Sequence, residues 1–209
     1  MLPLNESFHT LRARVEARIT LPALVVVSGA QRGEGTTTVA CGLARAFAAD
    51  GHRTLLVDAN AAHAAVADEL GVLALPGLAP AAGDLGARNG EVPRLSLVAL
   101  QDTNSREERQ AGLLNETRER FTITIVDAGP LALCSTALHI VRSADAVVLA
   151  VRLGRRSGDN DREALQLCGE RLIGVVPTRA RSLRATALAK ASNVQAALRA
   201  VVPTIGAVR

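Results

Sequence analysis

A glycine-rich segment close to the N-terminus constrains the fold of this chain more than any other feature. Residues 24–28, LVVVS, form a short apolar run, and residues 29–38, GAQRGEGTTT, lead into a segment with the apolar spacing of a helix. A strand, a glycine-rich turn and a helix in this order predict a loop whose backbone N–H groups and helix N-terminus hold phosphate oxygens. The expected phosphate contacts are Arg32, Gly33, Glu34, Gly35, Thr36, Thr37 and Thr38.

The loop has no lysine at the position where such loops carry one. The G-K-[ST] end of the phosphate-loop pattern places the lysine at Thr36 and the Mg²⁺-binding hydroxyl at Thr37. A threonine supplies no positive charge, and Arg32 is the only cation within the loop sequence. The planar guanidinium of an arginine at another point of the loop does not replace the point charge of a lysine. The sequence therefore predicts a phosphate site that lacks its neutralising cation.

Two later apolar runs end in an aspartate. Asp58 ends the run in TLLVDAN (residues 54–60), and Asp127 ends the run in TITIVDAGP (residues 122–130). In phosphate-loop proteins an aspartate at the end of a neighbouring strand binds Mg²⁺ or its water ligands, so Thr37, Asp58 and Asp127 are the candidate metal ligands. Alternatively, each carboxylate caps the helix or turn that follows its strand. The sequence leaves both roles open.

The composition excludes several classes of protein. The formal net charge is +4, but the chain has no Trp or Tyr and only three Phe, so a base-stacking platform for nucleic acid is not expected. No run of 18 apolar residues predicts a membrane-spanning helix, and the charged N-terminal segment lacks the apolar core of a secretory signal. The isolated Cys41, Cys134 and Cys168 are expected to be reduced thiols. These features predict a cytoplasmic protein with a single domain over residues 1–209.

Apolar runs alternate with helix-like patterns along the chain, which predicts an α/β fold. The expected strands are residues 23–28, 53–58, 95–100, 121–127, 145–151 and 171–176. The expected helices are residues 5–18, 36–49, 61–70, 105–120, 136–142, 159–168 and 182–201, with residues 71–94 irregular. This alternation predicts a doubly wound, mostly parallel sheet of the P-loop NTPase type, with helices on both faces and ligands at the carboxyl ends of the strands.

The order of three motifs resembles one family of P-loop proteins. The three motifs follow the order found in the cytoplasmic domain of bacterial tyrosine kinases (BY-kinases). There the counterpart of SGAQRGEGTTT is S-x-x-P-G-E-G-K-S-T, that of TLLVDAN is hhhhD-x-D, and that of FTITIVDAGP is F-D-x-h-h-h-D-T-P-P. The GEG triplet at 33–35, and Gln31 where a second signature lysine would fall, distinguish the chain from the related MinD/ParA partition ATPases. The resemblance continues through RLIGVVPTRA (residues 171–180) and covers nearly the whole chain.

The chain departs from the BY-kinase pattern at positions that serve catalysis in that family. Thr36 replaces the lysine, Asn60 replaces the second acid of D-x-D, and Ala128-Gly129 replaces Thr-Pro. Thr178 replaces the asparagine that contacts the nucleotide base, and it is the expected base contact here. The family phosphorylates its own tyrosine cluster, whereas this sequence contains no tyrosine. Together these departures predict a degenerate, pseudokinase-like member. The vestiges of its catalytic site are Asp58, Asn60 and Asp127.

The resemblance implies a role in capsular or exopolysaccharide biosynthesis and export. As a BY-kinase-like regulator or scaffold, the chain would bind Mg-ATP or Mg-ADP weakly and would act through the cytoplasmic tail of a membrane polysaccharide co-polymerase, at the periphery of the inner membrane. One alternative is an active ATPase or kinase that acts on a separate protein, with Arg32 or a partner's residue in place of the lysine. Another is a partition-type ATPase of the MinD/ParA kind.

The N-terminal helix carries a candidate surface for self-association. ESFHTLR (residues 6–12) resembles the E-x-x-R-x-x-R motif through which BY-kinases form ring-like contacts: Glu6 and Arg12 match, and His9 stands where an arginine is usual. The spacing of three residues places these side chains along one side of a helix, although an ordinary solvated helix face explains them equally well. Because a histidine is charged only below about pH 6.5, we expect a homo-oligomer that is weaker than in the family and favoured by acid.

Overall fold

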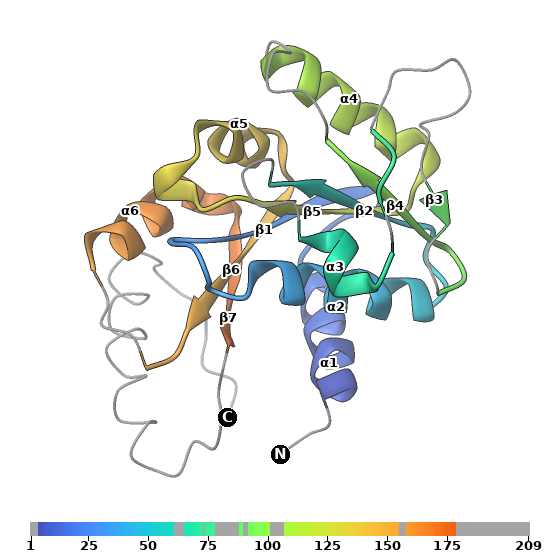
Figure 1. The fold of residues 1–209 in the computed structure, drawn as a ribbon, viewed down its shortest axis with the longest axis horizontal. Coiled ribbons are helices and arrows are strands. Elements are labelled where there is room, and N and C mark those ends of the chain that lie inside the picture. Colours follow the sequence, from blue (N-terminus) through green and yellow to red (C-terminus); the bar gives the residue numbers. More distant parts are fainter. Residues whose placement is uncertain are drawn as a thin grey trace.

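The fold is built around a seven-stranded sheet with the order β3-β4-β2-β5-β1-β6-β7 (Figure 1). The computed structural model describes residues 4–60, 65–72, 74–77, 88–89, 92–100, 107–154 and 158–178. The strands are β1 (Ala23–Gly29), β2 (Thr54–Ala59), β3 (Arg88–Asn89), β4 (Leu95–Ala99), β5 (Ile123–Ala128), β6 (Ala146–Arg152) and β7 (Leu172–Thr178). The α-helices are α1 (Leu4–Glu16), α2 (Thr36–Ala49), α3 (Val66–Leu70), α4 (Glu107–Arg120), α5 (Ser135–Ser143) and α6 (Asp159–Cys168).

The strands pair in parallel everywhere except between β3 and β4. Strands β1, β2 and β5 are buried along their whole length, and for this reason they are rich in Val, Ile and Leu on both faces. The chain places β2 and β4 on one side of β1, and β6 and β7 on the other. The strand order therefore switches at β1, at whose carboxyl end the glycine-rich loop begins.

Helices cover both faces of the sheet (Figure 1). On one face Leu43 and Phe47 of α2 pack on the sheet together with residues of α1 and α3. On the other face the sheet packs against Leu114 of α4, Ile140 of α5 and Leu165 of α6. These two apolar layers form the core, and burying side chains of this size contributes about 1.5–3 kcal/mol each. The predicted doubly wound, mostly parallel sheet is confirmed.

The observed elements differ from the sequence-based predictions most clearly at the edge of the sheet and at the end of the first helix. The stretch 71–94 is not wholly irregular, because Arg88–Asn89 form the edge strand β3, antiparallel to β4; two residues are too few to give a periodic signal. The N-terminal helix ends at Glu16 instead of residue 18, because the amides of Arg18 and Ile19 make tighter i→i−3 bonds. Of the helix predicted at 61–70, the described part is Val66–Leu70, and the helix predicted at 182–201 lies outside the described residues.

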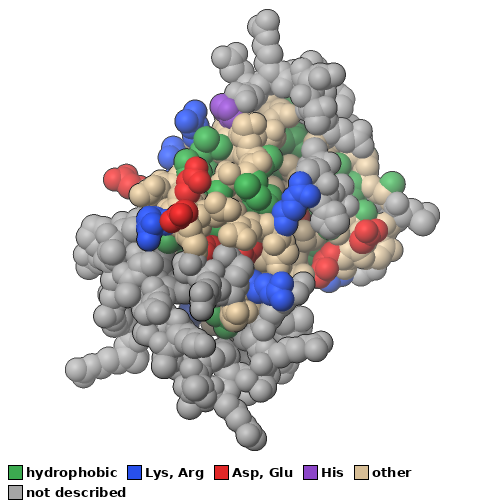
Figure 2. All heavy atoms as spheres, turned by 60° about the vertical axis from the view of Figure 1, so that its left-hand side comes forward, with side chains coloured by type: hydrophobic (Ala, Val, Ile, Leu, Met, Phe, Trp, Pro, Cys, Tyr) green, Lys and Arg blue, Asp and Glu red, His purple; other side chains and the backbone are tan. Residues whose placement is uncertain are grey.

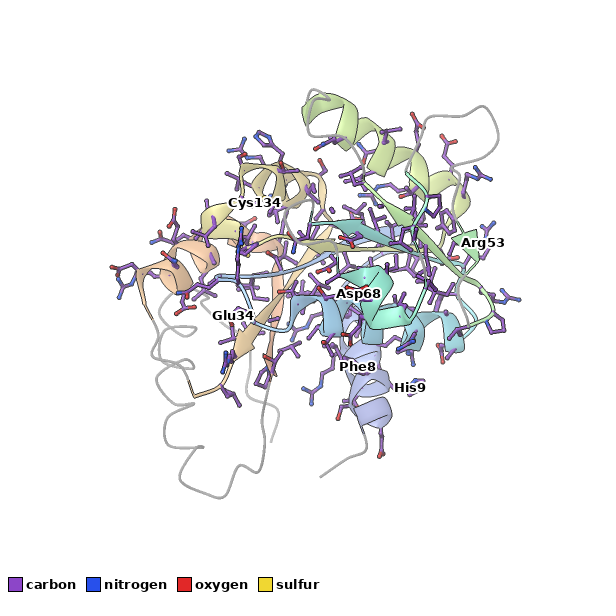
Figure 3. All side chains as sticks on the ribbon, in the orientation of Figure 1. Phe8, His9, Glu34, Arg53, Asp68 and Cys134 are labelled. Carbon is purple, nitrogen blue, oxygen red and sulfur yellow. The ribbon has the colours of Figure 1, made fainter. Side chains whose placement is uncertain are left out.

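Helix α1 packs on the outer side of α2 through a notch left by a glycine. A Cβ added at Gly42 would lie 2.3 Å from Cζ of Phe8, so the phenyl ring occupies the space above that glycine. Further along α1, Val15 is 2% exposed and joins the core on this face of the sheet. Figure 3 shows Phe8 and His9 on α1. The first helix is therefore an integral part of the fold.

An ion cluster fixes the other end of α1. Arg12 pairs with Glu16 in the same helix and lies 2.9 Å from a carboxylate oxygen of Asp50, just after α2. Arg12 is thus engaged within the chain, whereas Glu6 is exposed and His9 is half-buried. Self-association through Glu6, His9 and Arg12 stays a prediction.

The charges on one face of the molecule are mixed in sign. In Figure 2, basic and acidic side chains lie among each other on the described part of this face and form no continuous basic surface there. The expectation that the chain does not bind nucleic acid stays a prediction.

Candidate functional site

The glycine-rich loop joins the carboxyl end of β1 to the first turn of α2. Gly33 and Gly35 have φ angles of +77° and +83°, a region that residues with a Cβ rarely adopt. Gly35 is the N-cap of α2, and in the described part of the chain no side chain caps this helix. The first N–H groups of a helix have no intrahelical partner, so this end of α2 can bind an anion.

The side chain of Glu34 points inward and does not line the outside of the loop. Glu34 is 1% exposed, and its carboxylate accepts a hydrogen bond of 2.6 Å from the backbone N–H of Arg152 at the end of β6. The hydroxyl of Thr178, at the end of β7, donates a bond of 2.5 Å to the carbonyl oxygen of Glu34. Figure 3 labels Glu34 on the β6 side of the loop. The sequence grouped Glu34 and Thr178 as nucleotide contacts, and the structure brings them together with each other.

The hydroxyl of Thr37 reaches the aspartate at the end of β5. Thr37 Oγ1 donates a hydrogen bond of 2.7 Å to Oδ2 of Asp127. Asp127 is fully buried, and its Oδ1 is without a hydrogen-bond partner in the described part of the chain. Burial raises the pKa of Asp127 to about 7, the bond from Thr37 opposes this, and the nearby Asp58 carboxylate adds to it. A buried acceptor without a partner needs a reason, and a bound cation is one.

Asp58 lies directly beside Asp127 in the sheet register. Its Oδ1 accepts the N–H of Asn60 and its Oδ2 accepts the N–H of Val66 at the start of α3, both at 3.1 Å. Asp58 therefore binds the backbone directly after β2 and at the first residue of α3, as in the structural role that the sequence left open. Its role as a metal ligand stays a prediction.

The donor set at this place fits Mg²⁺. A hydroxyl and two carboxylates are hard oxygen ligands of the kind Mg²⁺ prefers, and the unpartnered Oδ1 of Asp127 leaves a ligand position open. Thr37, Asp127 and Asp58 would hold the ion. Bound there with a nucleotide, Mg²⁺ would neutralise phosphate charge.

The remaining predicted residues are arranged around this centre. Arg32 and Thr38 are exposed, and Thr36 is half-buried in the first turn of α2. The single lysine of the sequence, Lys190, lies outside the described residues. Asn60 faces the end of β5, where its Oδ1 would lie 3.3 Å from a Cβ added at Gly129.

Two contacts of the site were not predicted from the sequence. The first is the hydrogen bond that the backbone N–H of Arg152 donates to the carboxylate of Glu34. In the second, the hydroxyl of Ser28 donates a bond of 2.7 Å to the carbonyl oxygen of Gly129. The second bond joins the ends of β1 and β5 behind the loop. A backbone donor has no signature in the sequence, whereas a Ser that ends an apolar strand is a signal for a bond between strand ends.

Comparison with known proteins identifies the family of the chain. Residues 25–206 match the CobQ/CobB/MinD/ParA nucleotide binding domain. The chain belongs to this family. Among its curated relatives, the tyrosine-protein kinase CpsD of Streptococcus pneumoniae is 24% identical over 192 residues, which cover 82% of each chain.

Solved structures of the CobQ/CobB/MinD/ParA fold superpose on the chain. The chimerical protein CapA2B2 has a TM-score of 0.74 at 21% identity, with 87% of each chain covered. The kinase domain of the Escherichia coli tyrosine kinase ETK has a TM-score of 0.71 at 18% identity, covering 87% of this chain and 79% of its own. The Pyrococcus furiosus cell division ATPase MinD has a TM-score of 0.64 at 18% identity, covering 82% of this chain and 79% of its own. The resemblance to BY-kinase domains and to the P-loop fold is confirmed.

Proposed function

We propose that the chain is a degenerate BY-kinase-like regulator or scaffold of capsular or exopolysaccharide biosynthesis and export. In this proposal it binds Mg-ADP or Mg-ATP weakly and does not transfer phosphate. The observation that carries the proposal is a loop with the backbone form of a phosphate site and an intact bond between Thr37 and Asp127, but with Thr36 in place of the cation. The similarity to CpsD and ETK supports the tyrosine-kinase branch of the family.

The size of the loss argues against catalysis. Phosphoryl transfer depends almost entirely on positioning and on stabilisation of charge, so removing a cation next to the transferred group costs several kcal/mol of transition-state stabilisation. At about 1.4 kcal/mol per factor of ten, the reaction slows by roughly a thousandfold. Asn60 removes a second charged group, and the sequence offers no tyrosine for self-phosphorylation.

The proposed partner is the cytoplasmic tail of a membrane polysaccharide co-polymerase. In the described part of the chain, no helix combines the length and the apolar character needed to cross a bilayer. In this proposal the membrane-embedded partner holds the chain at the cytoplasmic side of the inner membrane.

The test is an assay of purified protein with Mg-ATP labelled in the γ-phosphate, with and without a peptide that carries a tyrosine cluster, together with calorimetric titration of Mg-ADP and Mg-ATP. We expect no label transfer, no hydrolysis above background and a dissociation constant well above that of an intact P-loop kinase. Transfer to the peptide at the rate of a normal kinase would establish the rival function, an active kinase with another cation. ATP-dependent dimerisation with DNA or membrane binding would establish a partition-type ATPase.

A further inference from the structure

The exposed glycine-rich loop contains one buried charged residue. Arg32 and Gly33 are exposed, yet Glu34, between Gly33 and Gly35, is 1% exposed. Burying a carboxylate costs free energy unless hydrogen bonds compensate it, so a position of this kind in a loop requires specific partners.

Glu34 is fixed by contacts on three sides. Its carboxylate accepts a hydrogen bond of 2.6 Å from the N–H of Arg152 on β6, and its carbonyl oxygen accepts one of 2.5 Å from the hydroxyl of Thr178 on β7. Beneath it, the stem of the side chain crosses Gly29, where an added Cβ would lie 2.9 Å from Glu34 Cβ and 3.0 Å from Cγ. The middle of the loop is thereby tied to three strand ends.

This anchoring bears on ligand binding because the loop is intrinsically permissive. The glycines on both sides of Glu34 give the backbone many accessible shapes, and only some of these direct the N–H groups of residues 33–37 at one point. A loop that already holds the binding shape loses no conformational freedom when the ligand binds. The apparent affinity for the ligand therefore rises in proportion to the fraction of molecules in which the loop has that shape.

We propose that Glu34 and Thr178 are positioning residues that hold the phosphate-binding loop in its binding shape from the ends of β6 and β7. The inference rests on the proposed nucleotide binding and deepens it. It also reassigns Thr178: its hydroxyl serves the loop backbone, whereas the resemblance to BY-kinases implies a contact to the base.

The experiment uses pairs of variants that keep or remove one bond. Thr178→Val is nearly isosteric but cannot donate, and Thr178→Ser keeps the hydroxyl; Glu34→Ala removes the carboxylate, and Glu34→Gln keeps an acceptor oxygen. Calorimetry measures the affinity for Mg-ADP, and amide hydrogen exchange without ligand measures the protection of residues 33–37. Thermal unfolding measures overall stability. Thr20→Val, at an exposed threonine that precedes the amino end of β1, opposite the carboxyl end where the loop begins, is the matched control.

We expect Thr178→Val to weaken binding about fivefold and to speed exchange in the loop, as loss of one hydrogen bond predicts. Glu34→Ala should weaken binding more, by roughly tenfold or above, while Thr178→Ser and Glu34→Gln should stay within about twofold of wild type. Gly29→Ala should resemble Glu34→Ala, because the new methyl group displaces the Glu34 stem.

Unchanged loop exchange in Thr178→Val and Glu34→Ala overturns the inference, as does a lower melting temperature without faster loop exchange. Failure of Thr178→Ser to restore what Thr178→Val loses also overturns it. If wild type binds neither Mg-ADP nor Mg-ATP, the proposed nucleotide binding is wrong, and the exchange of residues 33–37 still decides whether Glu34 and Thr178 hold the loop.

Discussion

At residue 36 the chain carries a hydroxyl where a phosphate loop ordinarily carries an ammonium group. The surrounding loop has the backbone form for binding, since Gly33 and Gly35 have positive φ angles and α2 begins at Thr36. We expect Thr36→Lys to raise the affinity for Mg-ADP roughly ten- to a hundredfold, because a charge-assisted contact to phosphate contributes about 1.5–3 kcal/mol. Calorimetric titration of both proteins under the same salt conditions measures the change.

Gln166→Lys provides the control for Thr36→Lys. This residue is exposed on α6, so the variant adds the same charge away from the loop and should leave the affinity within about twofold of wild type. An equal gain in both variants would mean that general electrostatic attraction, and not a contact in the loop, accounts for the effect. Restored catalysis is not expected, because Asn60 still lacks a second carboxylate.

The carboxylate of Asp127 makes stability depend on pH. The folded state raises the pKa of Asp127 from 3.8 to about 7, so it binds a proton that the unfolded state releases between these values. Stability from this residue is therefore full below pH 3.8 and is lost as the pH rises through 7. We expect Asp127→Asn, without metal or nucleotide, to raise the free energy of unfolding by about 4 kcal/mol at pH 8 and by roughly 1–2 kcal/mol near pH 5, since one pKa unit corresponds to about 1.4 kcal/mol.

Urea unfolding of wild type and Asp127→Asn at both pH values measures this difference. The exposed Glu116 on α4 offers a matched control, and Glu116→Gln should change stability by less than about 0.5 kcal/mol at either pH. A destabilised Asp127→Asn at pH 8 would show that the charged carboxylate is compensated in the fold. Addition of Mg²⁺ should reduce the difference in the free energy of unfolding between Asp127→Asn and wild type, because the ion stabilises wild type alone.

At the scale of elements, the contact between α1 and α2 reverses the usual effect of a helix glycine. Alanine is normally better than glycine inside a helix by about 0.5–1 kcal/mol, but a Cβ at Gly42 would collide with the ring of Phe8. We expect Gly42→Ala to lower the free energy of unfolding by about 1 kcal/mol and to speed amide exchange in α1. In a Phe8→Ala background, the same change should be stabilising.

Chemical denaturation of the four proteins of this cycle measures the coupling between Phe8 and Gly42. Gly112→Ala in α4 is the control, because no atom lies within 4 Å of the added methyl group and the change should stabilise by its helix propensity alone. If Gly42→Ala stabilises the protein with Phe8 present, the ring moves aside at little cost and does not hold α1 in place.

The central elements could be predicted from the sequence because their signals are local. The helix expected at 36–49 and the one at 159–168 have the observed bounds, and the inner strands are correct within about two residues. The edge strand Arg88–Asn89 could not be predicted, because two residues give no local pattern and only the pairing with β4 defines the strand. The end of α1 at Glu16 depends on the bonding of the last turn, which residue preferences do not specify.

The candidate site could be predicted as a set of residues but not as a set of contacts. The motifs placed Thr37 and Asp127 at one edge of the sheet, and the structure joins them by a hydrogen bond. The bond from Thr178 to Glu34 joins residues 144 positions apart, so no local pattern could reveal it. The same holds for Arg152, whose contribution is a backbone N–H that any residue would provide.

At the scale of the whole molecule, the position of α1 sets what its surface offers to a second copy. Arg12 is engaged with Glu16 and Asp50, while Glu6 is exposed on the same helix. A neighbouring subunit would therefore meet Glu6 and part of His9, and it could contact Arg12 only by competing with Asp50. Each exposed ion pair across an interface contributes about 1 kcal/mol or less. An interface with fewer charged side chains available for such pairs is therefore weaker.

The last prediction is that the chain self-associates weakly through α1 and does so more at pH 6 than at pH 8. In this contact His9 of one copy would face an acidic group of the neighbour such as Glu6, and acid favours the charged form of histidine side chains in general. Sedimentation velocity at several concentrations should show a fast component at pH 6 that Glu6→Ala abolishes and the control Glu116→Ala retains. The cluster of His52, Glu16 and Asp50 lies within the chain, with His52 Nε2 3.1 Å from Glu16, and Glu6→Ala leaves that cluster intact. A concentration-independent monomer at both pH values would contradict the prediction and leave attachment to a different protein as the only route to assembly.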